Sequence, residues 1–440
     1  MYDLQDKYIF FYLKYLKIQR KTVYYRNRQK SDSRCFLYHS CMQFADERFI
    51  MNIDFLKHYD IIVTGGGIAG VAAAIQAARC GKKTALIEKT VWCGGLATTG
   101  LVYVYLPLCD GNGRQLTFGL AEELLFRSIK YGPGDIGKNW REEKNCDETA
   151  RFRCVFSPAS FIIALDEILE ENNVDVWYDT VVCGVTQEGA KLSSITVCNK
   201  SGLGELFADC FVDATGDAEL YRKCNVPCHD AENFLAVWAL EFRRGEKDQK
   251  TFCSGLGDEV FIYPRNEEPM SRGIDGKKVS RYMLDSRKIL RERYANQTEN
   301  RYDRYPLFVP GMPQYRKIWS IDAAYVLTEK DETAPFEDSI GMVGDWRKPG
   351  PVWEIPYRSL YTPGGPENLI AAGRCTGADG DAWEITRVIP TAALTGQTAG
   401  FAASLALDSN TSIQNVDVCK LQKDLSDAGI LLRRCELKTL

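Results

Sequence analysis

Runs of apolar residues separated by turn-forming residues predict alternating strands and helices along most of the chain. An apolar run at 61–63 predicts a buried strand, and the Ala-rich stretch 68–80 predicts a helix that ends before Gly81. Residues 84–87 predict a second strand. Similar patterns predict helices at 116–129, 157–170, 389–407 and 416–431, and strands at 174–185, 194–197, 206–212 and at the start of 368–378.

Three glycines stand between the first predicted strand and the first predicted helix. Gly65, Gly67 and Gly70 have G-x-G-x-x-G spacing, which permits a tight turn, close approach of a pyrophosphate and close packing of helix on strand. The helix N-terminus would offer free N–H groups and a positive dipole end to the phosphates. Glu88, at the tip of the second strand, is placed to accept a hydrogen bond from a ribose hydroxyl. Together these features predict dinucleotide binding.

The pattern changes near residue 225, where aromatic and charged residues replace long apolar runs until about residue 350. This composition suits an inserted α+β cap with a polar, aromatic-lined substrate pocket, although an ordinary solvated exterior would share it. The predicted fold class is α/β, with a Rossmann-like parallel sheet, a β-meander and this insertion. The predicted domains are a nucleotide-binding first part at 56–225, the substrate or cap domain at 226–352, a nucleotide-binding second part at 353–408, and a C-terminal helix and tail at 409–440.

Residues 1–55 do not match the rest of the chain, because they are aromatic and basic without the alternation of a core element. The apolar stretch 8–16 is too short, and too interrupted by Lys14, to span a bilayer. A membrane-surface helix is one interpretation. The interpretation that we favour is a poorly ordered extension or a start codon assigned too early, since Met51 opens almost directly onto the first strand.

Composition narrows the classes of function. The chain has 440 residues, of which 45% are hydrophobic and 26% charged, as is ordinary for soluble proteins. A net charge of −4 and the lack of a basic stripe in the sequence give no reason to expect nucleic acid or an anionic membrane as partner. The 16 cysteines are scattered, so we expect buried thiols in a reducing cytoplasm. With three histidines in the chain, Cys224 and Cys228 are not expected to bind metal, and no metal site is predicted.

Several later motifs carry a family resemblance. They are GGLATTG at 94–100, DATGDAE at 213–219, IPYRSLYTPGGPENLIAAGRC at 355–375 and TRVIPTAALTGQTAG at 386–400. With the fingerprint at 65–70, their order resembles the flavin-dependent oxidoreductases of the glutathione reductase-like superfamily. Within that superfamily the chain looks most like the bacterial group known only as FAD-dependent oxidoreductases. The resemblance runs from about Tyr59 to the C-terminus.

The resemblance implies FAD as the cofactor. The fingerprint and Glu88 would hold the pyrophosphate and the adenosine ribose, and the backbone of Val182 would read adenine. Residues 95–98 would pass beside the pyrophosphate and isoalloxazine, and the helix starting near Pro390 would direct its N–H groups at the flavin pyrimidine. The implied cofactor residues are Gly65, Gly67, Ile68, Ala69, Gly70, Glu88, Lys89, Gly94, Gly95, Leu96, Ala97, Thr98, Val182, Ala214, Thr215, Gly216, Asp217, Gly373, Arg374, Pro390 and Thr391.

Three arginines are predicted to work on the substrate. Many members of the superfamily have Gly-Asp where this chain has Gly-Arg374, so Arg374 could stabilise anionic flavin or bind an acidic substrate. A phosphate contact or a structural salt bridge explains Arg374 equally well. Arg387 and Arg316 could clamp a substrate carboxylate, with a structural role as the alternative. His229 and Tyr357 are weaker predictions for proton transfer.

The predicted activity is hydride or two-electron transfer between a small organic substrate and non-covalently bound FAD. The sequence has no second G-x-G-x-x-G with a strand before it and a helix after it, and no ferredoxin-like cysteine run, which disfavours a built-in NADPH domain or iron–sulfur cluster. One alternative is a flavoprotein subunit that passes electrons to a protein partner. Another is a protein that binds FAD without redox chemistry. The late motifs argue against a simple NAD dehydrogenase.

Overall fold

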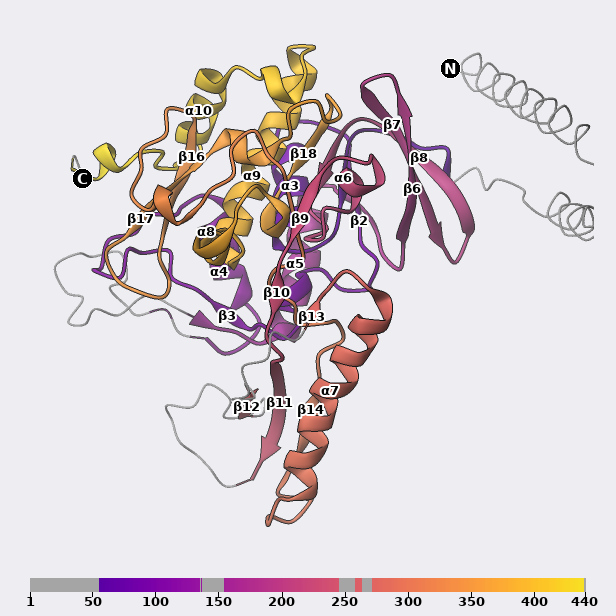
Figure 1. Ribbon diagram of the computed structural model, residues 1–440, viewed down its shortest axis with the longest axis vertical. Helices are drawn as coiled ribbons and strands as arrows, with labels where there is room; N and C mark the ends of the chain where they lie inside the picture. Colours follow the sequence, from indigo (N-terminus) through magenta and orange to yellow (C-terminus); the bar gives the residue numbers. More distant parts are fainter. Residues whose placement is uncertain (1–54, 135, 137–153, 245–257, 263–270, 439–440) are drawn as a thin grey trace, which may run out of the picture. The chain divides into compact units, whose positions relative to one another are not determined.

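A seven-stranded sheet of order β5-β2-β1-β8-β7-β6, with β18 also paired to β8, organises the computed structural model (Figure 1). The structure describes residues 55–134, 136, 154–244, 258–262 and 271–438. The predictions for residues 1–54 therefore lie outside the described residues. The sheet strands are β1 (His58–Thr64), β2 (Thr84–Ile87), β5 (Asp175–Trp177), β6 (Val181–Glu188), β7 (Lys191–Asn199), β8 (Gly202–Asp213) and β18 (Leu369–Ala371).

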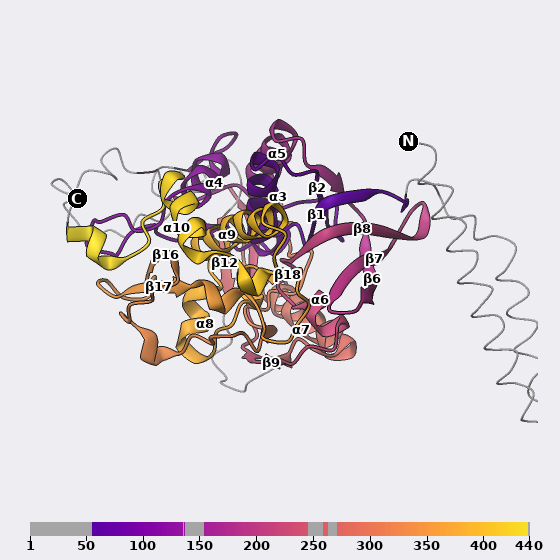
Figure 2. The ribbon, with the colours of Figure 1, turned by 90° about the horizontal axis from the view of Figure 1, so that it is seen from above.

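Strand β8 belongs to two kinds of pairing at once. Its second half runs parallel to β1 and to β18, and β2 and β5 extend this parallel part on the other side of β1. Its first half pairs antiparallel with β7, which pairs with β6 to complete the predicted meander. Figure 2 shows this meander beside the parallel strands. The α/β fold class with a parallel sheet and β-meander is confirmed.

Different elements pack on the two faces of the parallel sheet. Each strand contributes side chains to both faces, because alternate residues point to opposite sides. Ile61 and Val63 of β1 pack into the core formed with helices α3, α4, α5 and α9. Ile62 packs on the other side against the meander and α6. The helices named here are α3 (Ile68–Arg79), α4 (Leu120–Ser128), α5 (Pro158–Glu171), α6 (Glu219–Lys223) and α9 (Ile389–Asp408).

Helices α3 and α9 touch backbone to backbone at two glycines. A Cβ placed on Gly396 would lie 2.1 Å from the carbonyl oxygen of Ala69, and one on Gly400 would lie 2.6 Å from that of Ala73. Both distances are far below van der Waals contact, so only glycine permits this approach. The contact fixes the start of α3 against the middle of α9.

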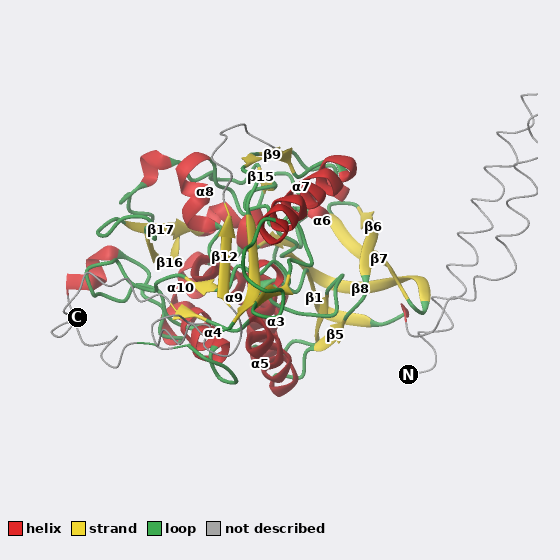
Figure 3. Cartoon of the chain, turned by 90° about the horizontal axis from the view of Figure 1, so that it is seen from below, coloured by secondary structure: helices red, strands yellow, loops and turns green. Residues whose placement is uncertain are grey.

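The insertion forms a small sheet of order β12-β11-β14 with the long helix α7 on one face. Val237 and Ala239 of β11 pack against Leu290 of α7. Figure 3 shows α7 and α5 on opposite sides of the described structure, as does Figure 2. The elements of this region are β9 (Cys228–Asp230), β10 (Glu232–Asn233), β11 (Val237–Arg243), β12 (Asp258–Ile262), β13 (Ser271–Arg272), α7 (Gly276–Ala295), β14 (Arg304–Phe308) and β15 (Trp319–Ile321).

Most predicted elements differ from the observed ones at their ends, but the strand predicted at 174–185 is two strands, β5 and β6, separated by a turn at Asp179, whose φ is +49°. The helix predicted from residue 116 begins at Leu120, because Gly119 has a φ of +65° and the amide of Leu116 bonds to the carbonyl of Leu108 at 2.7 Å. Among the described residues, no helix has both the length and the apolar character needed to cross a bilayer. The remaining elements are β3 (Val104–Tyr105), β4 (Cys154–Val155), β16 (Ser339–Gly344), β17 (Val352–Pro356), α8 (Gly380–Thr386), α10 (Val418–Asp427) and short 3-10 turns at 95–97, 329–331, 357–360, 373–375, 413–415 and 434–438.

Candidate functional site

The glycine turn after β1 packs tightly against the loop that follows β8. A Cβ on Gly65, whose φ is +91°, would lie 2.6 Å from the carbonyl oxygen of Ala214. A Cβ on Gly70 would lie 1.8 Å from the carbonyl oxygen of Gly65. These two glycines are therefore required by contacts within the protein, and they bring the turn, the first turn of α3 and the loop 214–217 together.

Gly67 differs from its neighbours because a Cβ there would meet no protein atom within 4 Å. It is the N-cap of α3, with φ −65° and ψ 175°, and no side chain caps the free amides of this helix end. Ile68 and Ala69 are nevertheless buried. A buried helix end without a capping side chain has amide donors for an anion, and the open side of Gly67 leaves room for one.

Glu88 sits at the tip of β2 beside this helix end and is buried. Its two carboxylate oxygens accept hydrogen bonds from the amides of Gly66 at 2.7 Å and Thr90 at 2.8 Å. A carboxylate has about four acceptor sites, so one per oxygen is left for the predicted ribose hydroxyls. The amide of Thr180 donates to the carbonyl of Glu88 at 3.1 Å, which places the strand that carries Val182 next to this end.

The GG loop (residues 94–100) and the loop after β18 also approach the start of α3. A Cβ on Gly95 would lie 3.1 Å from the Cα of Gly67. A Cβ on Gly373, whose φ is +78°, would lie 2.8 Å from the Cβ of Ala69. The amide of Gly373 donates to the hydroxyl of Thr395 in α9 at 3.0 Å. The structure thus brings together the segments that the sequence predicted around one cofactor.

The start of α9 is a second helix end without a capping side chain. Val388 is its N-cap, and Pro390 in the first turn has no N–H to satisfy. The hydroxyl of Thr391 donates to the carbonyl of Ile385 at 2.8 Å, so it is engaged within the protein. The remaining amides of this turn suit partial negative charge.

Asp217 carries an oxygen that lacks a partner. Among the described residues its Oδ1 is buried and makes no hydrogen bond. The guanidinium Nη2 of Arg374 lies 4.0 Å from this oxygen, and the Nζ of Lys89 lies 3.9 Å from Oδ2. The gap between Asp217 and Arg374 is longer than a hydrogen bond, so a polar group between them would be well placed.

Arg374 lies across the backbone of Gly216 and donates from Nη1 to the carbonyl of Tyr315 at 2.8 Å. Burial lowers the pKa of Arg374, although the nearby Asp217 carboxylate opposes this shift. A buried guanidinium whose neighbouring carboxylate lies at 4.0 Å, beyond hydrogen-bond distance, favours a further anion nearby. The contact with Tyr315 also links the loop after β18 to the cap.

Arg387 and Arg316 already have partners in the protein. Both Nε and Nη2 of Arg387 donate to Glu384, whose other oxygen lies 3.1 Å from the Nζ of Lys317. Burial raises the pKa of Glu384, but the charges and hydrogen bonds of Arg387 and Lys317 outweigh burial and lower it. Arg316 donates to the carbonyl of Gln314 at 3.0 Å and lies over the ring of Trp238. To bind a substrate carboxylate, either arginine would therefore have to give up its present partner or share it with the substrate.

Neither predicted proton-transfer residue has a free group facing the glycine turn. Tyr357 is buried, its hydroxyl donates to the carbonyl of Ile413 at 2.7 Å, and burial raises its pKa well above the ordinary value. His229 has Nδ1 3.0 Å from Asp322 and Nε2 3.1 Å from the carbonyl of Ala378. These contacts favour structural roles for both residues.

The segment 314–317 makes long-range contacts that the sequence did not indicate, although Arg316 within it was predicted to bind the substrate. The amide of the Gln314 side chain donates to the carbonyl of Gly100 at 2.6 Å, at the end of the GG loop. Together with the contacts of Tyr315 to Arg374 and of Lys317 to Glu384, it joins this segment to the loop 94–100, to the loop after β18 and to α8. Nothing in the local composition of this segment signals that role, because each contact is made with a residue distant in sequence.

A second missed feature is a buried polar group behind the GG loop. The hydroxyl of Tyr178 lies 3.4 Å from the sulfur of Cys93 and donates to Asp166 in α5. Burial raises the pKa of Cys93 to about 12, and the hydrogen bond from Tyr178 only partly offsets this. The thiol next to the loop is therefore protonated at neutral pH, which makes it a poor nucleophile.

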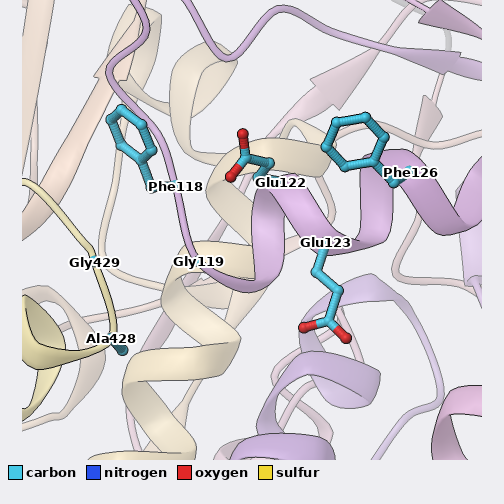
Figure 4. Close-up of a pocket in the computed structure, with 7 residues that line it drawn as sticks. All are labelled: Phe118, Gly119, Glu122, Glu123, Phe126, Ala428 and Gly429. Atoms are coloured by element: carbon cyan, nitrogen blue, oxygen red, sulfur yellow. The ribbon is translucent and has the colours of Figure 1, made fainter. Parts of the chain in front are cut away.

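A shallow pocket of about 280 Å³ lies away from these residues, between α4 and the end of α10 (Figure 4). It is lined by Phe118, Gly119, Glu122, Glu123, Phe126, Ala428 and Gly429. Glu123 is held by Arg79 at 2.9 Å, so this side chain is engaged. None of the predicted cofactor or substrate residues lines the pocket.

The residues around Gly67 fit the AMP and pyrophosphate parts of FAD. The uncapped start of α3 supplies amide donors, Glu88 supplies acceptors for a diol, and Asp217 has an unsatisfied oxygen within the same group of loops. The start of α9 supplies further donors on the far side of Gly373. This donor set matches a dinucleotide with two negative phosphates and two hydroxyl-bearing ends.

Comparison with known proteins agrees with this chemistry. The profile of the family described as "FAD dependent oxidoreductase" matches residues 60–233 and 263–425. A digeranylgeranylglycerophospholipid reductase of Thermoplasma volcanium is 23% identical over 227 residues, which cover 50% of this chain and 57% of the reductase. The enzyme of that name from Thermoplasma acidophilum is 22% identical over 227 residues, which again cover 50% of this chain and 57% of the reductase. The chain thus spans a little over half the length of these curated relatives.

Two solved structures have similar backbones. A geranylgeranyl bacteriochlorophyll reductase-like protein from Thermoplasma acidophilum has a TM-score of 0.45 at 17% identity, covering 84% of this chain and 83% of the other. The aromatic hydroxylase CabE from angucycline biosynthesis has a TM-score of 0.46 at 13% identity, covering 87% of this chain and 71% of the other.

Proposed function

The chain belongs to the FAD-dependent oxidoreductase family, and on this premise we propose that it transfers two electrons between a small organic substrate and a non-covalently bound FAD. When bound, FAD supplies the redox chemistry. The protein binds and orients the substrate and excludes water from the site. The observation that carries the proposal is the buried, uncapped start of α3 beside the open face of Gly67. We also propose that the chain is a member of the glutathione reductase-like superfamily and that the protein is located in the cytoplasm.

Cofactor binding is assigned to the segments that converge on Gly67. The amides of Ile68, Ala69 and Gly70 would bind the pyrophosphate, and Glu88 would bind the adenosine ribose. The first turn of α9, near Pro390, would stabilise negative charge on the flavin pyrimidine. The close packing of Gly396 on Ala69 supports this arrangement, because it holds the two helix starts at a fixed separation.

The substrate side is assigned to the face of β11 that points away from α7. Trp238 of β11 has its ring 6.0 Å from that of Tyr103, which follows the GG loop by three residues. The guanidinium of Arg316 lies 5.1 Å from the centre of the Trp238 ring. A flat apolar substrate with an acidic group suits these neighbours, since rings supply contact area and arginine supplies a fork of donors.

Replacing Gly67 by Ala tests the cofactor assignment directly. The added Cβ meets no protein atom, so the fold should persist, whereas the methyl group should block the pyrophosphate. We expect the purified full-length wild type to be yellow and the variant to have lost at least 90% of its FAD, roughly a tenfold or larger drop in affinity. The measurement is FAD content from the visible spectrum, with circular dichroism as the folding check.

Gly276→Ala is the matched control, because a Cβ there also meets nothing within 4 Å but lies at the start of α7. It should keep the FAD content of the wild type. Normal FAD content in Gly67→Ala would refute the assigned site. A wild type that is colourless and fails to take up added FAD would remove the proposed function itself.

A further inference from the structure

Helix α7 presents a basic stripe on the face opposite its buried side. Residues 271–304 contain ten Lys and Arg but five Asp and Glu, a net charge of +5 in a chain whose total is −4. The buried side of α7 consists of Tyr282, Ser286 and Leu290. With 3.6 residues per turn, the opposite face carries most of the cations. We define the basic stripe as Lys277, Lys278, Arg281, Arg287, Lys288 and Arg291, all exposed.

The stripe is only partly neutralised. Arg281 pairs with Asp285 at 2.7 Å and Lys288 with Glu292 at 3.7 Å, both exposed i,i+4 pairs of small energetic value. Within the described part of the chain, Lys277, Lys278, Arg287 and Arg291 make no ion pair. A charge count over the whole chain missed the stripe, because the total of −4 hides this local excess of cations.

This arrangement opposes the stability of the helix itself. Lys277 and Lys278 lie in the first turn, which contains no acidic residue, where positive charge meets the positive end of the helix dipole. Arg287 and Arg291, like Lys277 and Arg281, are like charges four residues apart, which is unfavourable on an isolated helix. The N-cap Asp275 offsets part of this cost by accepting a hydrogen bond from the amide of Lys278, and the remaining like-charge repulsion favours a partner that carries negative charge.

Apolar side chains accompany the cations. Leu284 is 53% exposed in the centre of the stripe, Ile274 is 42% exposed just before α7, and Tyr302 is 63% exposed beyond its end. The phosphates of nucleic acid would leave these side chains without a suitable environment. The interface of a lipid bilayer accepts both, since basic groups contact anionic headgroups while apolar and aromatic groups enter the acyl boundary.

The position of the stripe argues against a redox partner. The opposite side of α7 packs through Leu290 on β11, and the far face of β11 contacts Tyr103 near the GG loop through Trp238. The small sheet therefore lies between the stripe and the proposed cofactor site. A partner on the stripe would be held away from the flavin, so the surface suits positioning of the enzyme.

We propose that the basic stripe of α7, with Leu284 at its centre, docks the enzyme peripherally on an anionic lipid bilayer. Helix α7 has 20 residues and is therefore about 30 Å long, so it can lie along the membrane plane over its whole length. Attraction of several cations to anionic headgroups supplies the binding, and Leu284 adds apolar contact. The docking is reversible and involves no membrane-spanning segment.

The test is sedimentation of the full-length, FAD-loaded protein with vesicles of phosphatidylcholine containing 30% phosphatidylglycerol, and with pure phosphatidylcholine. The stripe variant carries Lys277→Gln, Arg281→Gln, Lys288→Gln and Arg291→Gln. We expect the wild type to bind only the anionic vesicles, and the stripe variant to bind at least about 50-fold more weakly. High salt should release the wild type, because salt screens exposed charges.

The matched control removes the same number of charges elsewhere, at the exposed positions Lys191→Gln, Lys200→Gln, Lys330→Gln and Lys420→Gln. It should bind like the wild type, and both variants should keep their FAD content and circular dichroism. Equal losses in the stripe variant and the control would overturn the proposal, as would unchanged binding of the stripe variant. Binding of a DNA duplex by the stripe without vesicle binding would replace the lipid bilayer with nucleic acid and would also overturn it.

A second measurement locates the contact. A tryptophan introduced as Leu284→Trp should be quenched by brominated lipid in anionic vesicles. Ile163→Trp provides the comparison, because Ile163 is similarly exposed at 56% but lies on α5, on the other side of the described structure (Figure 3). Quenching at 284 and not at 163 supports the orientation, and equal quenching at both positions contradicts it.

Discussion

At the scale of single residues, burial decides which chemically reactive groups take part in function. Cys93 lies directly before the GG loop, where a thiol could meet a flavin, yet it is fully buried and its pKa is raised to about 12. The thiolate that attacks disulfides and electrophiles is therefore scarce at neutral pH. This argues for a packing role and against disulfide chemistry at this loop.

Alkylation of the native protein checks this interpretation. With iodoacetamide at pH 8, we expect the exposed Cys183 and Cys419 to be modified, while Cys93 is modified only after unfolding. Mass spectrometry of peptides gives the extent at each position. Modification of Cys93 at the rate of Cys183 would show that the thiol is accessible and ionised.

Glu241 is the clearest buried charge of the cap. Its carboxylate lies 3.0 Å from Nη2 of Arg293 and 3.3 Å from Nε of Arg304, and it accepts from the hydroxyl of Tyr294 at 3.1 Å. Burial raises the pKa of Glu241, but the hydrogen bonds and charges of the arginines outweigh burial and lower it. Removing this charge would leave the partly buried arginines without their shared anion.

Glu241→Gln should therefore reduce the free energy of unfolding by about 3 kcal/mol at pH 7, measured by urea titration. Because the pKa is lowered in the folded state, this stabilisation is complete above the unfolded value of about 4.3 and is lost as pH falls through the folded pKa. The difference from wild type should shrink accordingly below pH 4. Glu299→Gln, which breaks only an exposed contact to Arg304, should change stability by less than about 1 kcal/mol. Equal effects of the two variants would contradict the buried cluster.

At the scale of elements, the contact of α3 with α9 positions both helix starts that we assign to FAD. Replacing a helix glycine by alanine normally stabilises by about 1 kcal/mol. At Gly396 the new Cβ would lie 2.1 Å from the carbonyl of Ala69, so overpacking should dominate. The sign of the stability change therefore reports whether the helices touch.

We expect Gly396→Ala to destabilise by about 1–3 kcal/mol and to weaken FAD binding at the same time. Thermal unfolding and flavin fluorescence measure the two effects. Gly276→Ala serves again as the glycine with open space around it. A stabilised Gly396→Ala variant with normal FAD affinity would show that the two backbones are not in contact.

Elements with a clear period could be predicted from the sequence, and elements fixed by distant partners could not. Helix α3, strand β2 and helix α9 begin and end close to their predicted positions, because their glycines, proline and apolar runs act locally. The insertion gave no such signal, since its strands are short and its long helix is mostly polar. The contact of Arg374 with the carbonyl of Tyr315 also escaped prediction, because Tyr315 is distant in sequence, whereas Arg316 and Arg387 pair with their near neighbours Gln314 and Glu384.

At the scale of the whole molecule, cofactor and fold should stabilise each other. Several segments far apart in sequence meet at Gly67, so FAD would bind the folded chain and hardly the unfolded one. At a hundredfold excess over its dissociation constant, FAD should add about 2.7 kcal/mol and raise the melting temperature by roughly 3 °C. Gly67→Ala should melt like apo wild type and show no shift. A full shift in that variant would place the cofactor elsewhere.

The double pairing of β8 also means that its two parallel neighbours become available at different times during synthesis of the chain. Its second half pairs on one edge with β1, which is made first, and on the other with β18, which follows only after the whole insertion. At ribosomal speeds the interval between Asp213 and Leu369 is on the order of 10–30 s. During it the nascent chain holds an open strand edge and a helix α3 without α9. Synthesis of the insertion thus separates the two halves of one cofactor site, and a nascent chain cannot hold FAD until nearly all of its residues exist.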